Sequence, residues 1–84
     1  MNARYSREAD ALYVRLQPGK IDHTEPFQGD DNRLVDYDAT GMPLGIEFLD
    51  ASRGIDLEAL PGAEEMLKAA KKFGLPVDAQ RRAG

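Results

Sequence analysis

Cysteine is absent from the 84 residues, and histidine occurs only once, at His23. Without cysteine the chain can form neither a disulfide nor a thiolate metal site, and secreted domains of this size usually need disulfides. We therefore expect a cytoplasmic protein. A single histidine excludes a two-histidine metal site and leaves only one ring for a nucleophile relay.

Long apolar runs and glycine-rich phosphate loops are also missing. Nowhere do 18 apolar residues follow one another, and residues 1–16 carry charges in place of an export signal. Gly41 and Gly45 lie within a strand-like stretch and not between a strand and a helix, as a phosphate loop requires. We therefore expect a soluble protein with no membrane segment.

Positive charge is in the minority, because the chain carries a net charge of −4 at pH 7. An acidic surface repels phosphate backbones, so nucleic-acid binding is disfavoured and a small basic partner protein fits better. The C-terminal third is locally basic, and we interpret this region as a solvated helix face. Its basic residues are Lys68, Lys71, Lys72, Arg81 and Arg82.

Two apolar runs around an Asp-Ala-Thr-Gly turn dominate the chain, over residues 32–53. They predict a β-hairpin in which Gly41 supplies the positive φ of the loop. A three-residue loop that pairs Asp38 with Met42 puts Leu34 opposite Ile46, whereas the apolar pattern favours Val35 opposite Ile46. One residue of slip separates these registers and exchanges the two faces, so both stay open at this point.

The remaining pattern predicts an α+β fold, an antiparallel four- to five-stranded sheet built as a meander of hairpins and covered by one C-terminal helix. Ala63, Met66 and Ala70 recur at helical spacing, with Pro61 at the first helical position and Gly74 at the left-handed cap. We expect one domain over residues 1–75 and a flexible tail over 76–84. The expected strands are 2–6, 11–16, 21–27, 32–38 and 43–49, and the expected helix is 61–73.

One helix covers only one face of such a sheet, and the hairpin carries apolar residues on both faces. The other face then needs a cover, for which we expect a homodimer or a heteromeric partner; the alternative is a sheet that curls around its own core. The candidate interface residues are Tyr13, Leu34, Tyr37 and Leu49. For the two tyrosines, ordinary half-buried packing is an equal alternative.

Carboxylates gather in the sequence around the hairpin, and together with His23 they are the candidates for a metal site or an acid/base pair. These carboxylates are Asp36, Asp38 and Glu47. Solubility and turn chemistry are the explanation we favour, since an aspartate that opens a turn accepts hydrogen bonds from backbone amides. We therefore assign no catalytic residue and expect no cofactor.

Two runs, YSREADALYVRL and VDYDATGMPLGIEFLDASR, resemble the small prokaryotic proteins of the family called domain of unknown function 2283. The matching elements are Tyr5, residues 8–13, residues 36–38, Gly41 and residues 45–52. The sequence departs from the family at Ser6 and Arg7, where Asp-Pro is common, and at Pro43, where an aliphatic residue is. The resemblance implies a compact antiparallel sheet with a C-terminal helix, and no established activity.

The interpretation we favour is a non-enzymatic protein-interaction module. Members of the family resemble, in size and acidity, the antitoxin side of small toxin and antitoxin pairs, so an antitoxin is one form of this hypothesis. The alternative is a small metal-dependent or acid/base enzyme that uses the hairpin carboxylates. A third possibility is an orphan fold with no discrete site.

Overall fold

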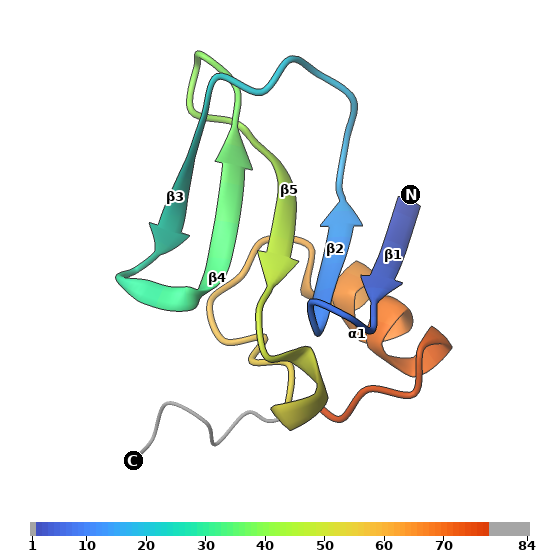
Figure 1. Cartoon of the computed structure of the whole chain (residues 1–84). Coiled ribbons are helices and arrows are strands. Elements are labelled where there is room, and N and C mark those ends of the chain that lie inside the picture. Colours follow the sequence, from blue (N-terminus) through green and yellow to red (C-terminus); the bar gives the residue numbers. More distant parts are fainter. Residues whose placement is uncertain (1, 78–84) are drawn as a thin grey trace.

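The computed structural model describes residues 2–77, which form one five-stranded sheet and one α-helix (Figure 1). All neighbouring strands are antiparallel, in the order β1-β2-β5-β4-β3. The elements are β1 (Asn2–Ser6), β2 (Ala11–Arg15), β3 (His23–Phe27), β4 (Asp30–Tyr37), β5 (Pro43–Phe48), the 3₁₀ turn η1 (Ala51–Arg53) and α1 (Ala63–Lys72).

The predicted α+β class is confirmed, with five strands and one helix near the C-terminal end. The sheet consists of the hairpin β1–β2 and the meander β3–β4–β5. These two units meet where β2 pairs with β5, so the connection between β2 and β3 crosses the end of the sheet (Figure 1). Each strand and the helix begin and end within two residues of the predicted bounds.

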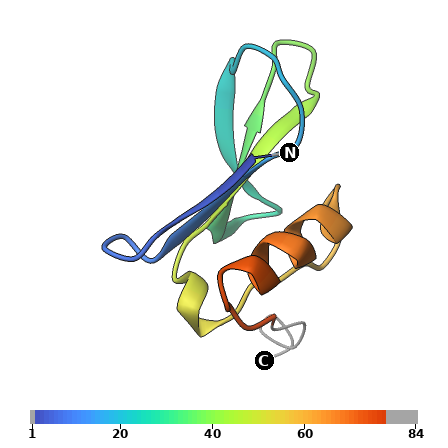
Figure 2. The ribbon, with the colours of Figure 1, turned by 90° about the vertical axis from the view of Figure 1, so that its right-hand side faces the viewer.

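The core lies between one face of the sheet and α1 (Figure 2). Strand alternation sends Leu12 and Val14 to this face and Tyr13 to the other, as the sequence predicts. From β4 and β5 the core receives Val35, Ile46 and Phe48, and from the helix Met66, Ala69 and Ala70, each no more than 1 % exposed. Full burial of a large apolar side chain stabilises a fold by about 1.5–3 kcal/mol.

A β-bulge resolves the two registers of the central hairpin. The loop is the three-residue one, because Asp38 N donates to Met42 O at 3.0 Å. Nevertheless Val35 lies opposite Ile46, since the pairing shifts between Asp36 and Tyr37 and leaves Leu44 as the extra residue. Both features expected from the sequence are therefore present, and one inserted residue reconciles them.

The helix begins at Ala63, so the prediction that Pro61 occupies its first position is wrong. Gly62 precedes the helix with φ 69°, a left-handed conformation that a helical residue cannot take. The end of α1 is as predicted: Gly74 has φ 68° and Leu75 N donates to Ala70 O at 2.8 Å. This is the Schellman pattern, which satisfies a free carbonyl of the last turn.

The segment after η1 ties the helix back to the sheet. Residues 57–60 form a tight turn, in which Leu60 N donates to Leu57 O at 3.2 Å. Ile55 forms an isolated parallel bridge with Val77, and its amide donates to Pro76 O at 2.8 Å. Two residues of the expected tail thus take part in pairing, while residues 78–84 lie outside the described part. Within residues 2–77, no helix has the length and apolarity needed to cross a membrane.

Arg33 is buried on the core face, with 1 % of its side chain exposed. Its Nε donates to Asp30 Oδ2 at 2.8 Å, and its Nη1 donates to Asp56 O at 3.2 Å and to Glu58 O at 2.8 Å. The guanidinium also lies over the ring of Phe27, 5.2 Å from its centre. A single arginine therefore anchors the 56–58 segment to β4.

We expect Arg33→Met to lower the free energy of unfolding by about 3 kcal/mol, because it removes the charged hydrogen bond to Asp30 Oδ2 and the hydrogen bonds to the Asp56 and Glu58 carbonyls. Urea denaturation followed by circular dichroism measures this loss. Arg53→Met is the matched control, since Arg53 is exposed in η1. Equal urea midpoints for the two variants would contradict the anchoring role.

Candidate functional site

The face of the sheet that α1 leaves uncovered carries the candidate site (Figure 2). Two rows of residues cross it, as the strand pairings show. We call this surface the open face and define it by Arg4, Tyr13, Glu47 and Leu34 in one row and by Arg15, Gly45, Asp36 and Thr24 in the other. Its centre is a shallow hollow of about 330 Å³, which Ile21 also lines.

A hydrogen-bonded group joins three strands across the open face. Tyr13 Oη donates to Asp36 Oδ2 at 2.8 Å, and Thr24 Oγ1 donates to Asp36 Oδ1 at 2.6 Å. Tyr13 is half-buried, and its pKa is raised, first by burial and then by the hydrogen bond to Asp36. Tyr13 therefore stays a neutral donor near pH 7, and its ring is held in a fixed position.

Gly45 allows the Tyr13 side chain to cross β5 and reach Asp36. It lies on β5, between Arg15 of β2 and Asp36 of β4, directly beneath the Tyr13 side chain. A Cβ at this position would overlap the Tyr13 hydroxyl and lie 2.7 Å from the ring carbon that bears it. A glycine inside a strand often marks such a close approach, but the sequence alone did not indicate which side chain crosses it.

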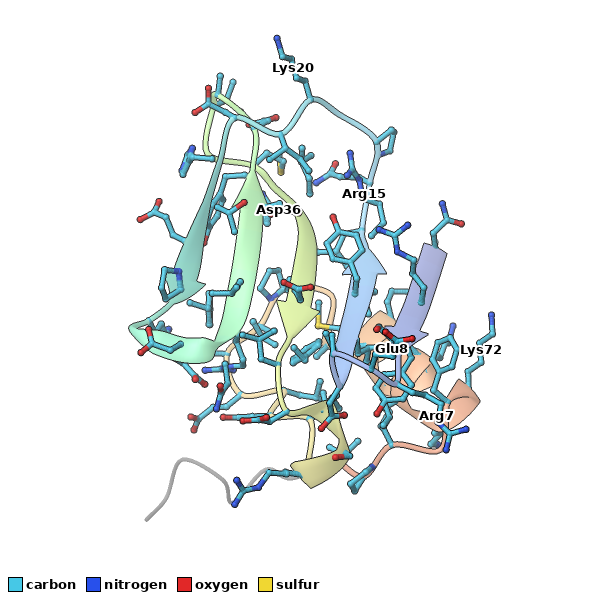
Figure 3. All side chains as sticks on the ribbon, in the orientation of Figure 1. Arg7, Glu8, Arg15, Lys20, Asp36 and Lys72 are labelled. Atoms are coloured by element: carbon cyan, nitrogen blue, oxygen red, sulfur yellow. The ribbon has the colours of Figure 1, made fainter. Side chains whose placement is uncertain are left out.

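Two arginines flank the Tyr13 ring. The guanidinium of Arg4 lies over the ring, 5.6 Å from its centre. Arg15 is held by backbone carbonyls, with Nε donating to Gln17 O at 2.9 Å and Nη2 to Gly19 O at 2.7 Å. Its Nη1 lies 3.5 Å from the Tyr13 hydroxyl. Figure 3 shows Arg15 and Asp36 on the same side of the sheet.

The four candidate interface residues divide between the two faces of the sheet. Tyr13 and Leu34 line the hollow of the open face, and Leu49 follows β5 as a half-buried residue whose amide donates to Asn32 O at 2.9 Å. Tyr37 lies on the opposite face, where it packs against the core and against the ring of His23. The structure therefore brings together Tyr13 and Leu34, and it separates Tyr37 from them.

The four candidates for metal or acid/base chemistry do not converge. Asp36 and Glu47 lie on the open face, whereas Asp38 sits in the β4–β5 turn and His23 on the edge strand β3. Within residues 2–77, no three His, Cys, Asp or Glu side chains gather in a way that could hold a metal ion.

The two outlying candidates have local partners. Asp38 Oδ1 accepts hydrogen bonds from Thr40 Oγ1 and from the amides of Thr40 and Met42, and its pKa is lowered, first by the Thr40 hydroxyl. The His23 ring lies between Asp22 and Glu25, at 2.9 Å and 3.0 Å, and its pKa is raised, first by the hydrogen bond to Asp22. Asp38 therefore stabilises the β4–β5 turn, as the turn explanation in the sequence analysis expects.

A second polar cluster lies around Asp10, and the sequence analysis did not predict it. Asp10 accepts hydrogen bonds from Tyr5 Oη at 2.6 Å, from Ser52 Oγ at 2.6 Å and from Ser52 N at 2.9 Å. The pKa of Asp10 is lowered, first by the Ser52 hydroxyl and then by that of Tyr5. Asp10 and Ser52 lie 42 positions apart, so no local pattern indicated their contact. The cluster joins the β1–β2 turn to η1.

Most residues of the open face and of the Asp10 cluster belong to the two runs that resemble a known family. A comparison with family profiles decides whether the chain is a member. The profile described as "Protein of unknown function (DUF2283)" matches residues 2–52 of the 84. The chain belongs to this family. The matched region of this DUF2283 protein contains all five strands, the open face and the Asp10 cluster. Neither the curated proteins nor the solved structures that were searched contain a match.

We expect Gly45→Ala to push the Tyr13 ring away from Asp36 and to lower the free energy of unfolding by about 1 kcal/mol, the usual worth of a hydrogen bond. A double-mutant cycle measured by urea unfolding isolates the cause. In a Tyr13→Ser background the same substitution has no ring to displace, so its cost should vanish. An equal cost in both backgrounds would show that Gly45 serves another purpose.

The lowered pKa of Asp10 gives a pH prediction with a definite sign. A depressed carboxyl pKa stabilises the fold above the unfolded-state value of about 3.9 and loses that effect as the pH falls through the folded-state pKa. We expect Ser52→Ala to raise the pKa of Asp10, as measured by the NMR shift of its carboxyl carbon. The stability difference from the wild type should then be largest above about pH 5 and shrink in acid.

The control for this titration is Ser6→Ala, at the end of β1 before the same turn. Ser6 Oγ accepts a hydrogen bond from Ala9 N, whereas the hydrogen bonds to the Asp10 carboxylate come from Tyr5 and Ser52. An Asp10 pKa that is the same in the wild type and in Ser52→Ala would show that the hydroxyl does not stabilise the carboxylate.

Proposed function

We propose that this DUF2283 protein is a non-enzymatic interaction module whose open face pairs with a second copy of the chain. The observation that carries the proposal is the division of the sheet into one face covered by α1 and one face without a cover. Tyr13 and Leu34 are half-buried at the centre of the open face. Tyrosine is enriched at the centre of interfaces because it joins a large apolar body to a polar tip.

The charges of the open face favour a second copy over a small basic partner. The whole chain carries a net charge of −4, but this face balances Arg4 and Arg15 against Asp36 and Glu47. In a two-fold dimer each surface meets itself, so a face that holds both signs can complement its own copy. A basic partner would gain little from a face with no net charge.

Pairing through faces fits the molecule better than pairing through the β3 edge. Pro26 removes one donor from that edge, and the ladder shifts between Pro26 and Phe27. Stable dimers bury about 800 Å² on each subunit, roughly one sixth of the 5148 Å² of this chain's surface. The area of one face of a five-stranded sheet is of the same order as this buried area.

An enzymatic role has less support from the site. His23 is 42 % exposed on an edge strand and lies apart from the carboxylates of the open face. An antitoxin role in the cytoplasm would be a special case of the same proposal, in which a small toxin takes the place of the second copy. The absence of cysteine from the sequence supports that compartment.

Light scattering coupled to gel filtration tests the dimer. We expect the wild type to have twice the chain mass of 9.3 kDa and Leu34→Glu to be monomeric, because it places a carboxylate opposite Glu47 at the centre of the face. Leu34→Lys should also weaken the dimer, while the lysine can pair with Glu47 within one chain and preserve the fold. Circular dichroism verifies that both variants are folded.

The matched control is Leu67→Glu, since Leu67 is 36 % exposed on the outer side of α1, away from the open face. We expect it to remain dimeric. A wild type that is monomeric at every concentration, or a Leu34→Glu variant that stays dimeric, would overturn the proposal.

A further inference from the structure

A second hollow, of about 530 Å³, lies beside the open face, where β2 leads into the 16–19 loop next to the start of β1. Its walls include Asn2, Arg4, Tyr13, Arg15, Leu16 and Pro18. Of the described residues 2–77, two arginines and no carboxylate line it, although acidic residues outnumber basic ones in the chain by 15 to 11. This hollow therefore concentrates positive charge in an acidic protein.

The charge of Arg15 is not neutralised by its own hydrogen bonds. Its Nε and Nη2 donate to the carbonyls of Gln17 and Gly19, which carry no net charge, and its Nη1 faces the Tyr13 hydroxyl. The same loop is tied to β5, since Gln17 Nε2 donates to Pro43 O at 2.8 Å. The guanidinium is thus held in place before any anion arrives, which lowers the entropic cost of binding.

Arg4 presents a second cation on the neighbouring strand. It lies over the face of Tyr13, whose hydroxyl is fixed by Asp36, so the ring orients the guanidinium from below. Among residues 2–77, neither Arg4 nor Arg15 forms an ion pair with a carboxylate. Two guanidinium groups therefore line this hollow, and the carboxylates nearest to them on the sheet, Asp36 and Glu47, line the hollow of the open face instead.

We propose that this hollow is a binding site for a carboxylate. Guanidinium groups bind carboxylates through paired, charge-assisted hydrogen bonds, and Leu16 and Pro18 supply an apolar wall for the carbon chain that bears the carboxylate. Long phosphate polymers fit less well, because only two cations oppose the negative charge of the rest of the surface. The carboxylate comes either from a small organic acid or from an acidic side chain of a peptide.

NMR titration of the full-length protein at constant ionic strength tests the site, with glutarate as one probe and an acetylated, amidated Gly-Glu-Gly peptide as the other. We expect saturable shift changes at Arg4, Tyr13, Arg15 and Gln17. The probe that binds more tightly identifies the source of the carboxylate. Shift changes spread over the surface, or changes that grow linearly without saturation, would overturn the proposal.

Arg4→Gln should weaken the tighter probe at least about fivefold, because it removes one of two charged donors from an exposed position where the fold does not depend on it. Arg7→Gln is the matched control, with the same change of charge in the exposed β1–β2 turn; Figure 3 shows Arg7 at the opposite end of this hairpin from Arg15. Equal affinities for the two variants would overturn the proposal.

Two further measurements distinguish this site from general anion attraction and from the dimer interface. Sulfate at matched ionic strength should compete weakly with the probes, and competition equal to that of glutarate would contradict a carboxylate site. Light scattering of the wild type with and without the tighter probe measures the dimer independently of the probe-induced shifts, since Arg4, Tyr13 and Arg15 line both hollows while Gln17 lines only this one. A failure of the dimer and a failure of the carboxylate site are therefore distinguishable.

Discussion

The placement of β5 between β2 and β4 is the constraint on which the rest of the structure depends. Ile46 lies opposite Val14 on one side and Val35 on the other, and this row forms the centre of the core. The bulge at Leu44 sets the register: a slip by one residue would turn Ile46 outward and Gly45 inward. The same bulge therefore defines the core and leaves the space through which Tyr13 reaches Asp36.

The features that could be predicted from the sequence are those with a local physical cause. Alternation placed Leu12 and Val14 opposite Tyr13, the turn residues located the central loop, and Gly74 with Leu75 marked the helix end. The assignment of the β4 residues to the two faces could also be predicted, because alternation places Leu34 and Val35 on opposite faces. Tyr37 was grouped with Leu34 on residue type alone, and alternation along β4 argues against that grouping.

What the sequence missed depends on contacts between distant segments. Arg33 has no local signal of burial, since arginine is mostly exposed and its acceptors lie on the 56–58 segment. Asp10 and Ser52 meet only once the sheet has formed. The family profile covers both Asp10 and Ser52 and ends before α1. The matched region is therefore the sheet together with the Asp10 cluster, which joins the β1–β2 turn to η1.

The bridge between Ile55 and Val77 makes the helical segment a closed loop whose two ends lie side by side. The chain thus leaves the sheet and returns to the same place without interrupting any connection between strands. Met66, Ala69 and Ala70 of this loop complete the core, so the sheet depends on the loop for the cover of its apolar face.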